Sequence, residues 1–193
     1  MEEFMDIAGM VKRAKGLLLA PQNEWPLINA EKAGHIKVLL AWLLPLSLIS
    51  AVAALIGHVG FDLYWGSVSW GIKRAVLQLV LLIGGAYLTA FIVNALAEKN
   101  DSEKNQDQAL ALVAYSYTPI CLGGIFQIIP SLASLGSLVG LYGLYLLYVG
   151  LPPMMKTPQE KTAGYFVVSL ICAIGVHIVL AAVLAAILLR RLF

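Results

Sequence analysis

The sequence predicts an all-α protein: a polytopic membrane protein with a bundle of five transmembrane helices and an N-terminal amphipathic interfacial helix. Composition is the first observation behind this prediction, because 60% of the 193 residues are hydrophobic and only 12% are charged. Soluble domains average about 45–50% apolar and about 25% charged residues. The second observation is position. Nearly all the charged residues lie outside five apolar segments, each long enough for a helix to cross a bilayer core of about 30 Å.

The charge balance and the cysteine count exclude several classes of protein. The 13 Lys and Arg residues nearly balance the 11 Asp and Glu residues, so we expect no nucleic-acid partner. Two cysteines cannot hold a chain of this length together as a disulfide scaffold. A disordered chain is excluded as well, because its hydrophobic fraction would be far lower.

Residues 1–36 are predicted to form a cytoplasmic amphipathic and interfacial segment. Apolar residues recur there at three- and four-residue steps, with charged residues elsewhere around the same helix. This spacing is typical of a helix that lies on a membrane surface. We expect Pro21 to end this helix and a second interfacial stretch, with Trp25 at headgroup level, to follow. The apolar positions of the first helix are Phe4, Ile7, Val11, Ala14 and Leu18.

Residues 37–193 are predicted to form the five-helix transmembrane domain. The only Asp, Glu, Lys or Arg residues within its spans are Lys73 and Arg74, at the start of the second span. Pro130 and Ser131 alone separate the third span from the fourth, which predicts a tight antiparallel hairpin with a break at Pro130. The expected spans are residues 38–57, 72–96, 110–129, 132–151 and 165–189.

The basic residues near the span ends predict the orientation. Nine Lys and Arg residues lie on the side of the N-terminus and four on the other side. Because cytoplasmic loops carry the excess of Lys and Arg, we expect a cytoplasmic N-terminus and a C-terminus on the opposite side of the cytoplasmic (inner) membrane. Lys156 and Lys161 are expected to contact anionic lipid headgroups.

The sequence shows no site for catalysis, a cofactor or a metal. His35, His58 and His177 are far apart and have no carboxylate or cysteine at ligand spacing. No metalloprotease, nucleophile-elbow or phosphate-loop motif occurs. We therefore expect no enzyme activity, no cofactor and no metal.

His177 lies near the middle of the fifth span and has two interpretations. Ionisable groups inside a membrane are costly and often mark a proton or substrate path. No span offers an acidic partner, which favours a neutral imidazole hydrogen-bonded to a neighbouring helix. A transport or proton role is the alternative.

The third span contains Tyr115-Ser116-Tyr117-Thr118-Pro119. Pro119 frees the backbone carbonyl one turn earlier, at Tyr115, and nearby hydroxyl groups can satisfy it. This pattern predicts either a fixed kink or carbonyl groups exposed to a cavity. The fixed kink is the more common outcome.

The fourth span carries Tyr142, Tyr145 and Tyr148 at three-residue steps, together with small residues at four-residue spacing. Such spacing lets two helices approach closely. Packing within one chain is the plain interpretation, and a homodimer face or a polar groove is the alternative. The small residues are Gly136 and Gly140 in the fourth span and Ala181 and Ala185 in the fifth.

Several of these features together resemble the Yip1 family, and its short bacterial inner-membrane branch in particular. They are the N-terminal amphipathic helix, the run from Leu18 to Trp25, the five spans, Tyr115-x-Tyr117-x-Pro119, and the run from Tyr145 to Pro152. The resemblance implies a membrane topology. Eukaryotic relatives associate with small GTPases through a longer N-terminal region with an Asp-Leu-Tyr-Gly-Pro signature. Here the similar residues 62–66 follow the first span and lack the proline, so that role is not carried over.

The leading functional hypothesis is a non-enzymatic membrane protein that organises the membrane or an unknown protein partner. It would act through its helix faces and its N-terminal helix, alone or as a homo-oligomer. The alternative is a small transporter or channel for a neutral or apolar solute, although five spans give no even internal repeat. The expected lining of that pathway is Tyr115, Tyr117, Gln127, Tyr142, Tyr145 and His177.

Overall fold

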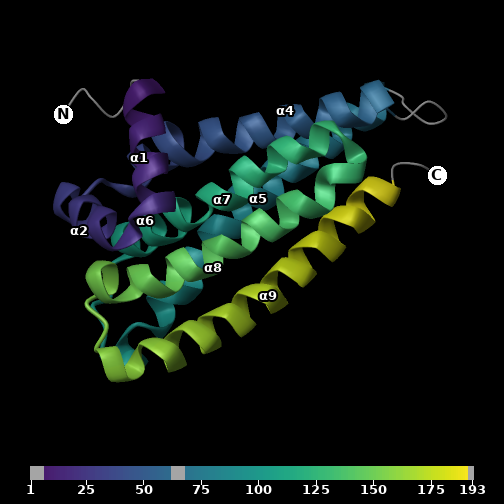
Figure 1. The fold of residues 1–193 in the computed structure, drawn as a ribbon. Helices are drawn as coiled ribbons and strands as arrows, with labels where there is room; N and C mark the ends of the chain where they lie inside the picture. The colour runs from purple at the N-terminus through teal and green to yellow at the C-terminus, as the bar shows by residue number, and fades with distance from the viewer. Residues whose placement is uncertain (1–6, 62–67, 191–193) are drawn as a thin grey trace.

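The computed structural model describes residues 7–61 and 68–190, and within these ranges the chain is helical and has no strand (Figure 1). The predicted all-α class is confirmed. Phe4 and residues 62–66 lie outside the described residues. Five segments of the described chain are long and apolar enough to cross a membrane, as predicted: His35–Gly60, Val68–Leu96, Gln106–Ile128, Pro130–Met155 and Gln159–Leu184.

Two short helices precede the first span, and both lie at one end of the bundle (Figure 1). In α1 (Ile7–Leu19), Leu17 is fully buried against the bundle, whereas Ile7 and Val11 are 77% and 62% exposed. Helix α2 (Pro21–Glu31) begins with a proline, whose missing N–H costs nothing at the first position of a helix. Its Trp25 is also fully buried. The amphipathic helix therefore packs on the protein through one face and leaves part of its apolar surface open.

The first span consists of three consecutive pieces: α3 (His35–Val38), a π-helical turn (Leu39–Leu43) and α4 (Leu44–Phe61). The π turn lies just before Pro45, whose ring crowds the carbonyl four residues earlier, and a wider turn relieves this clash. Trp42 lies in the π turn and is buried.

The second span is the single helix α5 (Val68–Leu96), which a 3-10 turn (Glu98–Asn100) follows. The third span is broken into α6 (Gln106–Ser116), α7 (Thr118–Gly123) and a 3-10 helix (Gly124–Ile128). In its most apolar part 72% of the residues are buried, against 11% for the fifth span. The third span is therefore the centre of the bundle.

A 3-10 turn at Pro130–Leu132 reverses the chain into α8 (Ala133–Met155), the fourth span. The two arms of this hairpin touch backbone to backbone, because a methyl group added at Gly136 would collide with the carbonyl oxygen of Gly123. A methyl group at Gly140 would meet a side chain of α7 at 3.4 Å. Both glycines thus allow close packing within the chain.

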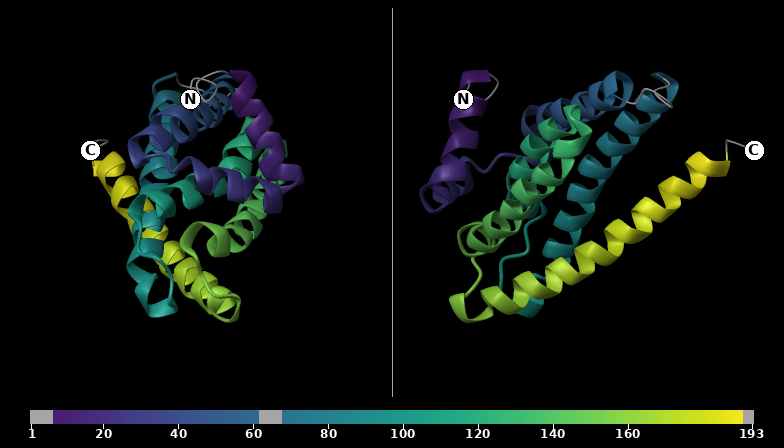
Figure 2. Two further views of the ribbon diagram at one scale, coloured as in Figure 1. Left: turned by 90° about the vertical axis from the view of Figure 1, so that its left-hand side faces the viewer. Right: turned by 45° about the vertical axis from the view of Figure 1, so that its right-hand side comes forward.

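The fifth span, α9 (Gln159–Arg190), lies along the outside of the bundle (Figure 2). Its buried residues recur at three- and four-residue steps, at Thr162, Tyr165, Ser169 and Ala173. His177 is the next residue on this face and is half-buried. The opposite face of α9 is exposed and apolar, as expected for contact with lipid.

Candidate functional site

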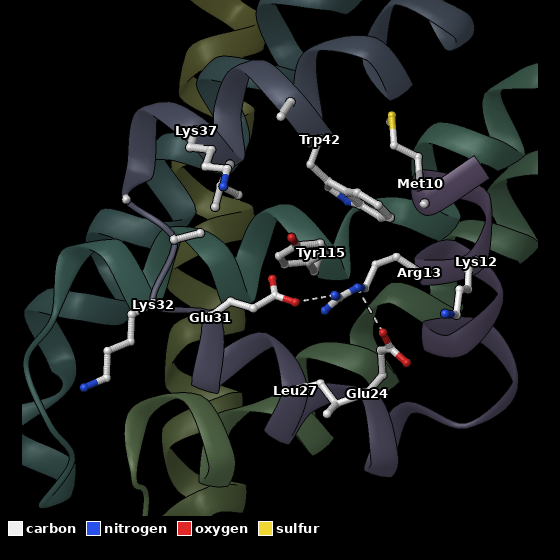
Figure 3. A pocket seen from close by; sticks show the side chains of 15 residues that line it. Met10, Lys12, Arg13, Glu24, Leu27, Glu31, Lys32, Lys37, Trp42 and Tyr115 are labelled. Carbon is white, nitrogen blue, oxygen red and sulfur yellow. Dashed lines mark hydrogen bonds and ion pairs between the residues drawn. The ribbon is translucent and has the colours of Figure 1, made fainter. Parts of the chain in front are cut away.

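A pocket of about 630 Å³ lies between α1, α2 and the start of the first span, and one residue of α6 contributes to its wall (Figure 3). We call it the cap pocket. Its lining combines charged side chains with the aromatic rings of Trp42 and Tyr115.

An ion triad forms one wall of the cap pocket. The guanidinium of Arg13, on α1, lies between the carboxylates of Glu24 and Glu31, both on α2 (Figure 3). The Arg13 Nε atom is 3.0 Å from Glu24 Oε1, and an Nη atom is paired with Glu31. These side chains are only 13%, 16% and 31% exposed, so the pairs are poorly screened by water. The triad fixes α1 to the first and last turns of α2.

The floor of the cap pocket depends on the break in the third span. The Thr118 hydroxyl donates a hydrogen bond of 2.6 Å to the Tyr115 carbonyl, which Pro119 cannot reach with an N–H. The same hydroxyl oxygen accepts a hydrogen bond of 3.2 Å from the Trp42 indole N–H. The rings of Trp42 and Tyr115 are held 4.7 Å apart. Thr118 thus satisfies the backbone at the break and holds the Trp42 indole, whose ring packs against that of Tyr115.

Three lysines complete the lining. Lys12 comes from α1, Lys32 from the end of α2 and Lys37 from α3, and all three are exposed. Together with Arg13, four basic side chains and two acidic ones line the pocket, a net charge of +2.

A second cavity, of about 260 Å³, lies among α5, the third span, α8 and α9. We call it the His177 cavity. His177 Nδ1 lies 2.8 Å from the Ala173 carbonyl and must donate to it. The other ring nitrogen, 3.1 Å from the Tyr117 hydroxyl, then accepts from Tyr117 in a neutral imidazole. Thr89 donates to the Gly85 carbonyl at 2.8 Å.

The His177 cavity is otherwise lined mainly by apolar residues. Ser116 also lines it, and its buried hydroxyl oxygen has no hydrogen-bond partner among the described residues. The hydrogen bonds of His177 are therefore internal to the bundle, and the groups around the imidazole are uncharged.

The remaining candidate residues line neither the cap pocket nor the His177 cavity. The Tyr142 hydroxyl donates to the Leu18 carbonyl at 3.0 Å and so ties α8 to α1. Tyr145 and Tyr148 are exposed on the surface of α8, and Gln127 packs through its backbone carbonyl against Gly57. Ala181 is exposed on α9, the helix that also carries Ala185.

Sequence reasoning missed the cap pocket as a unit. Arg13 pairs with residues 11 and 18 positions away on another helix, and no periodicity within one helix relates them. One pattern did point to it: Glu24 and Glu31 are seven residues apart and so share a face of α2. In the described parts of the chain, no three His, Cys, Asp or Glu side chains are grouped as a metal site.

The fold and its apolar surface define a class: a multi-pass, α-helical membrane protein, embedded in a lipid bilayer. The family follows from a comparison with protein-family models, in which the Yip1 domain matches residues 15–183. The chain belongs to the Yip1 family. It matches no curated protein and no solved structure in the corresponding comparisons.

Proposed function

We propose that this Yip1-family protein is a non-enzymatic organiser of the membrane or of a protein partner, acting through the N-terminal helix pair α1–α2. The proposal includes the cytoplasmic (inner) membrane as its location, a cytoplasmic N-terminus and membership of the short bacterial branch. It also keeps residues 1–36 as a unit distinct from the transmembrane domain of residues 37–193.

One observation carries the proposal: the helix pair is rigidly held yet offers an open apolar face. Leu17 and Trp25 anchor the pair in the core, and the Arg13 triad locks its two helices together. Outward, Ile7 and Val11 are exposed apolar side chains on α1. A held surface of this kind suits binding, because little conformational freedom is lost when a partner covers it.

A photoreactive amino acid placed at Val11 in native membranes tests the proposal. We expect it to form an adduct with lipid or with a partner protein, whereas the same probe at Lys99, an exposed residue outside the helix pair, should form far fewer. Replacing Ile7, one turn away on the same face of α1, by Ser should reduce the adducts at Val11. Equal adducts at both positions, unchanged by the Ser variant, would contradict the proposal.

The transporter alternative has one observation in its favour, the His177 cavity, and one against it. Tyr117 and His177 share that cavity, but Tyr115 lines the cap pocket and Tyr145 lies on the outer surface. The tyrosines therefore do not form one pathway in a single chain. Solute flux in proteoliposomes that is lost in Tyr117→Phe would favour the transporter.

A second copy of the chain is a further partner that we propose, seated on α9 through the Ala181 and Ala185 spacing. The exposed apolar face of α9 supports this proposal. Cysteine crosslinking of Ala181→Cys between chains tests it, with Ile171→Cys, exposed on the same helix, as the control. Equal crosslinking at the two positions would count against a specific dimer face.

A further inference from the structure

We propose that the cap pocket binds one anionic phospholipid, with the phosphate ester among its lysines and the glycerol and first acyl carbons against the apolar side chains of Met10, Leu27 and Ala41. The proposal rests on the function proposed above and assigns a ligand class to the N-terminal helix pair. It differs from general attraction to headgroups, because it assigns one saturable site with a fixed stoichiometry.

The position of the pocket is the first argument. Lys37 and Val38 line the pocket and also lie in α3, where the first membrane-spanning segment begins. The headgroup region of a bilayer lies just outside its hydrocarbon core, at the ends of such segments. The pocket is therefore placed at the depth of lipid phosphates.

The charges are the second argument. The lining has a net charge of +2, and its two carboxylates are both engaged by Arg13. Lys12 and Lys32 approach from different elements, at opposite edges of the pocket (Figure 3). Flexible lysine side chains can turn toward an anion bound between them.

Two lysines outside the cap pocket are already paired with carboxylates. Lys156 and Lys161, which were expected to contact headgroups, are paired with Glu103 and Asp101 across the loops at the same end of the bundle. The cap pocket, with its net positive charge, is therefore a better site for an anionic headgroup than the loops that carry Lys156 and Lys161.

The apolar floor is the third argument, and it favours a lipid over a free phosphate. Leu27 is 56% exposed, and Met10 and Ala41 are partly exposed, so these side chains offer apolar surface to a ligand above the buried rings of Trp42 and Tyr115. A small soluble phosphate ester would leave this surface uncovered, whereas a phospholipid covers it. The volume of about 630 Å³ lies within the range of roughly 300–1,000 Å³ that is usual for ligand pockets.

The pocket is also held in shape before any ligand binds. The Arg13 triad fixes one wall, and the Trp42–Thr118–Tyr115 hydrogen bonds fix the floor. Binding then costs little ordering of the protein.

The test uses the full-length protein, purified and examined by native mass spectrometry with lipids of identical acyl chains. Phosphatidylglycerol is the anionic probe, phosphatidylcholine the zwitterionic one and glycerol 3-phosphate the soluble phosphate ester. We expect one phosphatidylglycerol to bind at least tenfold more tightly than phosphatidylcholine, and glycerol 3-phosphate to bind more weakly than either lipid.

Two variants and a matched control locate the site. Lys12→Gln with Lys32→Gln should weaken phosphatidylglycerol binding at least tenfold. Lys15→Gln with Lys99→Gln, which removes the same charge from exposed lysines outside the pocket, should change it less than twofold. Ala41→Leu should also weaken binding, because it fills the floor and leaves every charge in place. Circular dichroism and thermal melting confirm that each variant is folded.

Equal loss in the matched control would overturn the proposal in favour of general surface attraction. Saturable binding of glycerol 3-phosphate without phosphatidylglycerol would overturn it in favour of a soluble ligand. Val11 adducts separate this result from the proposed function: if they persist while the lipid site fails, the helix pair still binds a partner and only the ligand assignment is wrong.

Discussion

Tyr115 and Tyr117 stand two residues apart in the third span, yet they belong to different sites. Two residues correspond to roughly 200° around a helix, so the two side chains leave on opposite sides. Tyr115 lies on the floor of a charged pocket at the N-terminal side of the membrane. Tyr117 is hydrogen-bonded to His177 in a cavity whose described lining contains no Asp, Glu, Lys or Arg. Charged groups thus line the pocket beside the N-terminal helix pair, whereas the hydrogen-bonded Tyr117 and His177 lie between the spans, where an unpaired charge would be costly.

The largest expected effect is on the stability of the helix pair α1–α2 beside the cap pocket. Arg13→Ala leaves Glu24 and Glu31 without their partner, which we expect to destabilise the helix pair by about 2–3 kcal/mol, less than for a fully buried pair because all three groups are partly exposed. Hydrogen exchange should rise across α1 and α2 and stay unchanged in α9. Adding Glu24→Gln and Glu31→Gln to this variant should restore part of the protection. A rise in hydrogen exchange in all helices would show that the stabilising effect of the triad is not confined to α1 and α2.

The next effect concerns the close packing that holds the third span between its two sites. Gly136→Ala places a methyl group against the Gly123 carbonyl, and we expect a loss of about 1–3 kcal/mol in an unfolding titration with a denaturing detergent. Gly175→Ala is the matched control, since no described residue outside its own stretch of helix comes within 4 Å of the added methyl group. This control should be neutral or stabilising, because alanine favours the helix. Equal losses in both variants would contradict the hairpin packing.

Thr118→Val tests whether the Thr118 hydroxyl stabilises the cap pocket without affecting the His177 cavity. The change keeps the shape but removes the hydrogen bonds to Trp42 and Tyr115, and we expect it to cost about 2 kcal/mol. Thr118→Ser should retain most of the stability. Crosslinking at Val11 and lipid binding should decline with Thr118→Val, while the His177 side should keep its protection from exchange.

The smallest loss of stability is expected at the His177 cavity. Tyr117→Phe removes the donor to His177, and hydrogen bonds between membrane helices are worth about 0.6 kcal/mol on average. We expect a loss of that order, insensitive to salt, whereas the effect of Arg13→Ala should shrink in high salt. Tyr148→Phe, at an exposed site, is the control and should be neutral. A larger loss for Tyr117→Phe than for Thr118→Val would reverse the comparison.

The composition was enough to predict the five spans, because each is an apolar run that any helical membrane protein must bury in lipid or in itself. It could not rank them, since the central third span and the outer fifth span are both apolar and only their neighbours differ. The motif around Pro119 correctly drew attention to a break in the helix, which the structure places between Ser116 and Thr118. Trp42, whose indole N–H donates to the Thr118 hydroxyl at this break, is 76 residues away from Thr118 in sequence and could not be identified from spacing.

The two facing glycines of the hairpin, Gly123 and Gly136, have a consequence for how the sequence can change over time. Each one's backbone fills the space that a side chain on the other would need. When a core residue grows, a neighbour can often shrink to make room, but glycine has nothing left to remove. A substitution at either position therefore has no compensating change at the other. The pair should resist replacement in a mutational scan, while Gly164 and Gly175, with open space beside them, should accept many residues.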